Sequence, residues 1–310
     1  MTVRAARRIP DMQPGSPEWL QIMTASKVAA VLGLSPWESR FSLYYRMAGQ
    51  LEAKPETAAT SRGHYLEDAV ATWLADQYPD LRFGRTGSWV NKARPWQSAT
   101  PDRIARERAT RRAVGVAEVK TAADYEEWGR DGSDDIPAYY RAQVVWQMDC
   151  LGLPAAYVAV LLPRLQLRGY VVRYDQGEAD WIRSEVQRFL ASLPGGPAEE
   201  APDIDAHDQT YVALRQLHPD IADREAEVPL SIAAPFCASV TALRAAEDEF
   251  ALRRAELAQH MGDAKKAVVR TSGDLVHTIA GRQSQRGGTP FVKAATRLPD
   301  LTEELLDVAG

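Results

Sequence analysis

The chain has 310 residues, of which 45% are hydrophobic and 25% are charged, with eight Trp and eleven Tyr. This composition is typical of a globular protein that buries a sizeable core, and it argues against a disordered chain. The formal net charge of −5 excludes a uniformly basic surface, so any contact with nucleic acid must use a local basic groove or bound cations.

The cysteines and the apolar segments indicate in which cellular compartment the protein is expected. Cys150 and Cys237 show no CxxC spacing and the five histidines are scattered, so neither a disulfide framework nor a zinc site is predicted. No stretch approaches the roughly 18 apolar residues that span a bilayer, and no apolar segment follows the N-terminal arginines. The sequence predicts a soluble cytoplasmic protein with no membrane contact.

Three helices are expected in the first quarter of the chain. The spacing predicts a helix over 24–32, closed by Gly33, and a second from Ser35-Pro36 to about Gly49. A third helix, capped by Ser61 and stopped by Pro79, would carry Glu67.

The middle of the chain alternates strands and helices. Residues 81–120 show a period of two broken by an arginine-rich turn, which predicts antiparallel strands with a hairpin. A helix over 137–151, strands over 155–162 and 167–174, and a helix capped by Asp175 follow. These elements predict an α/β fold with a mixed central sheet flanked by helices.

Three regions are expected along the chain. Residues 1–194 are expected to form the main α/β domain, 195–235 a linker rich in proline and acidic residues, and 236–310 a small C-terminal appendage. The appendage is expected to contain a helix over 238–261 and a hairpin that turns at Gly273-Asp274. It either packs on the core or pairs with another protomer.

Two short motifs on the predicted hairpin carry the chemistry. Asp102 begins one strand, and Glu118 and Lys120 end the other on a shared face because side chains alternate along a strand. Carboxylates and the Val119 carbonyl suit a hard divalent cation, and Lys120 would orient or deprotonate the attacking water. Glu67 is the candidate for a further carboxylate, which a site with two ions would need. Each motif is common without function, but their order favours a nuclease.

The ordered set of motifs resembles the YqaJ-type viral recombinases and lambda exonuclease, within the PD-(D/E)XK nuclease superfamily. The resemblance covers about residues 15–165. The matching residues are Trp19, Thr24-Ala25-Ser26, Leu32 to Trp37, Arg62-Gly63 with Glu67, Ala99 to Asp102, Glu118 to Thr121, and Tyr140 to Val144.

This resemblance implies a restriction-endonuclease-like core and a 5′ to 3′ exonuclease that acts on the ends of linear double-stranded DNA. The product would be a 3′ overhang for a single-strand annealing protein. The implied cofactor is Mg²⁺, with Mn²⁺ able to substitute, and the implied assembly is a ring-like homo-oligomer, with a trimer favoured. The alternatives are an endonuclease of restriction or repair type, and a catalytically inactive scaffold that binds DNA ends.

The resemblance also assigns roles to residues. The implied catalytic residues are Asp102, Glu118, Lys120, Glu67 and Gln143, and the implied metal ligands are Asp102, Glu118, Val119 and Glu67. The expected substrate-binding residues are Ser26, Arg103, Thr121 and Tyr140. Ser26 matches a position that contacts the 5′ phosphate, although an N-cap serine is an equal interpretation.

The sequence departs from the family pattern at two positions. The arginine that usually follows the tryptophan is missing before Ser26, and Lys27, Arg40 or Arg46 are candidates to replace it. The glycine that usually follows the Pro-Asp motif is Arg103, which is expected either to reach a phosphate or to be solvated. The arginines over 106–112 either follow a DNA backbone or are solvated.

Overall fold

The computed structural model describes residues 3, 5–12, 15–54, 57–271, 275–284, 288–296 and 298–301. It divides into two compact units, Met1–Ile221 and Ala222–Gly310. The division falls inside the segment predicted as a linker. None of the described helices is both long and apolar enough to cross a membrane.

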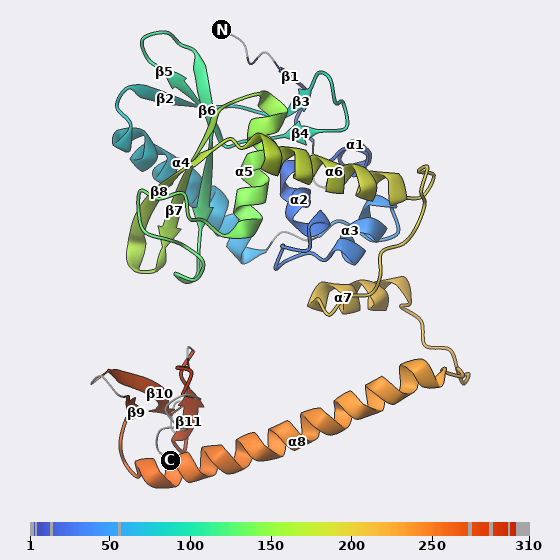
Figure 1. The fold of residues 1–310 in the computed structure, drawn as a ribbon, viewed down its shortest axis with the longest axis vertical. Coiled ribbons are helices and arrows are strands. Elements are labelled where there is room, and N and C mark those ends of the chain that lie inside the picture. The colour runs from blue at the N-terminus through green and yellow to red at the C-terminus, as the bar shows by residue number, and fades with distance from the viewer. Residues whose placement is uncertain are drawn as a thin grey trace. The chain divides into compact units, whose positions relative to one another are not determined.

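A five-stranded mixed sheet forms the centre of the first unit, in the order β2-β5-β6-β7-β8 (Figure 1). Its strands are β2 Leu81–Arg85, β5 Arg103–Glu107, β6 Ala113–Thr121, β7 Ala155–Leu162 and β8 Gln166–Arg173. Strands β6 and β7 are parallel, and the other neighbours are antiparallel. A small antiparallel sheet lies beside it, with strands β1 Ala6–Arg8, β3 Trp89–Asn91 and β4 Ser98–Ala99.

Helices cover both faces of the central sheet, as the sequence predicted. The helices of the first unit are α1 Pro17–Leu20, α2 Ala25–Val31, α3 Arg40–Met47, α4 Ala58–Gln77, α5 Ala138–Leu151, α6 Gln176–Ser192 and α7 Asp208–Leu217, with a 3₁₀ turn over Pro163–Leu165. Helix α4 buries Val70 and Leu74 against one face of the sheet, where they meet Ala105 and Ala117. Helix α5 packs on the other face. The α/β prediction is therefore confirmed.

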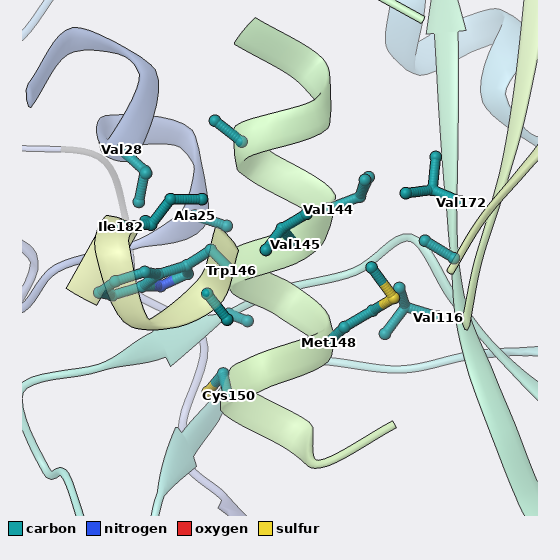
Figure 2. Close-up of a cluster of buried hydrophobic side chains, with 14 of the residues drawn as sticks. Ala25, Val28, Val116, Val144, Val145, Trp146, Met148, Cys150, Val172 and Ile182 are labelled. Atoms are coloured by element: carbon teal, nitrogen blue, oxygen red, sulfur yellow. The ribbon is translucent and has the colours of Figure 1, made fainter. Parts of the chain in front are cut away.

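The main core surrounds α5, which passes between the sheet and helices α2 and α6 (Figure 2). Val144 and Met148 point toward the sheet, whereas Trp146 lies toward α2 and α6. The helix ends at Gly152, whose φ of 67° is the left-handed conformation that glycine adopts without a Cβ clash. The predicted end of this helix is thus confirmed.

Two predicted helix starts are wrong. Helix α3 begins at Arg40 rather than after Ser35, because Ser39 and Ser42 form a capping box there. The Ser35 hydroxyl instead accepts hydrogen bonds from the amides of Trp37 and Glu38 and closes a turn. Helix α4 begins at Ala58, so Ser61 lies within its first turn and is not its cap.

The second unit consists of one long helix, α8 Leu230–Met261, and a three-stranded antiparallel sheet. Its strands are β9 Lys266–Arg270, β10 Val276–Gln283 and β11 Phe291–Ala294. Helix α8 starts eight residues before the predicted position and contains Pro235, which costs one backbone hydrogen bond in an exposed turn. The pairing of β9 with β10 matches the predicted hairpin, whereas its turn at Gly273-Asp274 lies outside the described residues.

Candidate active site

The hairpin of β5 and β6 brings the two predicted motifs together. The register pairs Arg103 with Ala117, so Asp102, just before β5, lies across from Glu118. One carboxylate oxygen of Asp102 accepts a hydrogen bond from the Val119 amide at 2.7 Å. Asp102 is thereby fixed at the end of β6, next to Glu118.

The Glu118 carboxylate is buried, with 4% of the residue exposed, and receives three hydrogen bonds. Lys120 Nζ donates to Oε1 at 2.6 Å, and Gln143 Nε2 donates to the same oxygen at 2.5 Å. Gln147 Nε2 donates to Oε2 at 2.8 Å. Strand β6 and helix α5 therefore fix the orientation of this carboxylate together.

Gln147 was not predicted from the sequence as a site residue. It lies four positions after Gln143, which places both amides on one face of α5. That spacing was the available signal. It would have identified Gln147 once the α5 face toward the sheet was known.

Lys120 is held as a cation. Burial lowers the pKa of its ammonium, but the carboxylates of Glu118 and Asp102 outweigh burial and raise the pKa above its usual value. The ammonium also lies 4.7 Å from the centre of the Tyr140 ring. A protonated lysine donates hydrogen bonds and stabilises negative charge.

The surroundings favour the charged form of Lys120 but the neutral form of Asp102. Burial, and then the neighbouring Glu118 carboxylate, raise the pKa of Asp102 to about 8. Two carboxylates here face one ammonium, so the group lacks positive charge when both are ionised. A divalent cation would supply it, and oxygen donors are the ligands that Mg²⁺ and Mn²⁺ accept. The donors at the hairpin thus fit a divalent metal ion, although the described residues contain no cluster of three or more His, Cys, Asp or Glu side chains.

Glu67 lies on α4 and is paired with Arg103. Arg103 is 5% exposed, and its guanidinium donates to Glu67 Oε1 and to Asp68 Oδ1, both at 2.5 Å. It also donates to the Asp102 carbonyl at 2.7 Å. Neither predicted alternative for Arg103, a free phosphate contact or a solvated side chain, describes this buried position.

The other predicted substrate-binding residues lie at different places. Tyr140 is half-buried, with the Lys120 ammonium over its ring. Thr121 is half-buried at the end of β6. Ser26 is exposed at the start of α2, where its hydroxyl lies 3.1 Å from the Thr24 hydroxyl. Thr24, rather than Ser26, occupies the N-cap position of α2. No hydrogen bond in the described part of the chain joins Ser26 to the carboxylates.

The cations proposed to replace the missing arginine have structural partners. Lys27 is buried, donates to the carbonyls of Trp19 and Ile22, and has a pKa lowered by burial to about 7. Arg40 donates to the Val31 carbonyl, and Arg46 pairs with Glu38 and the Glu52 carbonyl. These contacts hold the first three helices together.

Comparison with known proteins gives one family and several distant structures. Residues 18–154 match the family model described as the YqaJ-like viral recombinase domain. An alkaline exonuclease, LHK-Exo from Laribacter hongkongensis, is 21% identical, with 58% of this chain and 93% of that chain covered and a TM-score of 0.46. A phage-related exonuclease from Haemophilus somnus 129PT is 11% identical, with 55% and 93% covered and a TM-score of 0.40. No curated protein matches the chain.

The family match includes every residue that the hairpin and α5 bring together at the site. It begins before α2 and ends just after α5. The resemblance inferred from the ordered motifs is therefore confirmed, since residues 18–154 match the YqaJ-like viral recombinase domain.

Proposed function

We propose that the chain is a divalent-metal-dependent deoxyribonuclease that acts as a 5′ to 3′ exonuclease on the ends of linear double-stranded DNA. The observation that carries this proposal is the group of Asp102, Glu118 and Lys120, with Glu118 buried, on one hairpin inside the segment that matches the YqaJ-like domain. The product would be a 3′ single-stranded overhang, used by a single-strand annealing protein in phage-type recombination in the bacterial cytoplasm.

The ion would be held by Asp102, Glu118 and the Val119 carbonyl, with Mg²⁺ the expected metal and Mn²⁺ a substitute. When bound, it supplies a Lewis acid that stabilises charge on the phosphate and lowers the pKa of water. Lys120 is placed to donate to the attacking water or to a phosphate oxygen, since it is charged and lies beside Glu118. Gln143 and Gln147 keep the Glu118 carboxylate oriented.

Self-association is also part of the proposal, with a trimer favoured by the family resemblance. Its support is the surface of α8, where Phe236, Leu243, Phe250 and Leu257 recur every seven residues. The first three are more than half exposed. A seven-residue apolar repeat is typical of helices that pair with other helices.

The test is digestion of a linear duplex labelled separately at each 5′ and 3′ end, with Mg²⁺ or with EDTA. We expect Mg²⁺-dependent release of mononucleotides from the 5′ ends, and its loss in Lys120→Ala. Lys266→Ala, an exposed lysine of β9 in the second unit, is the matched control and should digest normally.

Other results would support one of the alternatives. Cleavage of closed circular DNA by the wild type would identify an endonuclease. A wild-type protein that binds DNA ends but releases no product would identify a scaffold.

A further inference from the structure

Arg103 carries a buried positive charge within the candidate site. Its guanidinium contacts Glu67, Asp68 and the Asp102 carbonyl, and only 6% of its side chain is exposed. Buried guanidinium groups persist when their donors are satisfied by acceptors, and here three acceptors surround one group. The arrangement is that of a built ion-pair site and not of a surface arginine.

Alternation along β5 places Arg103 on the α4 side of the sheet. Ile104 belongs to the core around α5, whereas Ala105 belongs to the cluster under α4. Arg103, two positions from Ala105, shares the α4 side and meets the carboxylates of that helix. Glu118, in contrast, is held by the two glutamines of α5. The carboxylates therefore form two groups, one toward each helix.

The two groups differ in charge. In the group toward α5, the carboxyl groups of Asp102 and Glu118 lie beside the single ammonium of Lys120, so this group would carry one net negative charge with both carboxylates ionised. This deficit is where a divalent cation is expected to bind.

The group toward α4 is already neutral. Arg103 pairs with both Glu67 and Asp68, and Arg85 pairs with the other oxygen of Asp68. A divalent ion bound to Glu67 would lie next to the Arg103 guanidinium, and repulsion between the two cations would weaken its binding. Glu67 thus has a resident counter-ion.

We infer that Arg103 takes the place of a second metal ion: it holds Glu67, and the site binds one divalent cation, on Asp102 and Glu118. This inference rests on the proposed metal-dependent function. It differs from the sequence-based expectation that Glu67 is a metal ligand. The sequence alone did not show that Arg103 pairs with Glu67. Arg103 is then a positioning residue that fixes α4 against β5 and limits the number of ions.

The test measures Mn²⁺ bound per chain by calorimetric titration of the full-length protein without DNA, so that catalysis is not needed. We expect one ion in the wild type, one ion in Glu67→Gln, and none in Asp102→Asn. In Arg103→Gln, the unpaired Glu67 should recruit a second ion, and Arg103→Lys should restore the single ion. Arg85→Gln is the matched control, since it removes a cation from Asp68 but not from Glu67, and it should bind one ion.

Two results would overturn the inference. The first is a wild type that binds two ions and a Glu67→Gln variant that binds only one, because this result would make Glu67 a metal ligand. The second is an Arg103→Gln variant that binds a single ion although it is as stable to unfolding as the wild type. A wild type that binds no Mn²⁺, or an ion that persists in Asp102→Asn, would overturn the proposed metal site itself, and the inference with it.

Discussion

Helices α5 and α8 have similar hydropathy but opposite surroundings. Helix α5 buries nine of its 14 residues, whereas α8, with 32 residues, buries only Met261. The difference arises from neighbours: α5 has a sheet on one side and two helices on the other, and α8 contacts β9 and β11 at one end. Apolar content alone therefore does not decide whether a helix supports a site. The buried helix can hold the amides of Gln143 and Gln147 in fixed positions.

Removing the largest buried side chain of α5 is expected to have the largest effect. Trp146 is 1% exposed, and its ring nitrogen donates to the Ser98 carbonyl at 2.9 Å. Trp146→Ala should lower the free energy of unfolding by about 3–5 kcal/mol, through the cavity and the lost hydrogen bond. Urea denaturation measures it. Trp181→Ala, an exposed tryptophan of α6, is the control and should cost well under half as much; equal costs would mean that α5 is not the centre of the core.

The charge deficit beside α5 predicts a dependence of stability on pH. In the unfolded chain Asp102 ionises near pH 4, whereas in the folded chain its pKa is about 8. The folded state therefore keeps a proton that the unfolded state releases, and stability falls as pH rises between about 4 and about 8. We expect the metal-free protein to lose about 2 kcal/mol across this window, less than the full linkage effect, because a carboxyl group that interacts with charged neighbours does not titrate independently.

Urea denaturation in EDTA at several pH values measures this loss. Asp102→Asn should flatten the slope, because the amide does not ionise. A slope that is identical in the two proteins would assign the pH dependence to other groups.

Gln147 tests whether the burial of α5 matters to the chemistry. Gln147→Leu keeps the size of the side chain but removes the donor to Glu118 Oε2. A hydrogen bond to a charged group contributes about 1.5 kcal/mol or more, so kcat should fall about tenfold while KM for DNA changes little. Gln259→Leu, on the exposed surface of α8, is the paired control and should leave kcat unchanged. A rise in KM alone would instead place Gln147 in DNA binding.

Local patterns predicted the parts of the site that depend on short distances along the chain. The hairpin joining Asp102 to Glu118 followed from strand alternation, and the end of α5 followed from Gly152. The pairing of Glu67 with Arg103 could not be predicted, because it depends on where α4 packs against β5, 36 positions away. Gln147 was missed for a similar reason, since its role depends on which face of α5 meets the sheet.

The second unit was harder to predict because few of its residues are buried. Helix α8 begins at Leu230 and continues through Pro235, a residue type that usually ends a helix. The first residues of α8 are not buried in a core, so no buried stripe in the sequence indicates where the helix begins. Strand β11 has a burial pattern without clear alternation, so its sequence gave no signal of period two. Patterns of buried residues therefore predict the bounds of a helix or strand only where that element packs against a core.

The exposed face of α8 gives the smallest expected effect on folding. Phe250 is 54% exposed, so Phe250→Ser should change the unfolding of a single chain by less than about 0.5 kcal/mol. Because Phe250 belongs to the seven-residue repeat, the same substitution should shift self-association to higher protein concentration, measured by sedimentation. Leu252→Ser, on the same helix but outside the repeat and 51% exposed, should change neither. An equal effect of the two substitutions on association would show that general stickiness, and not the repeat, holds the chains together.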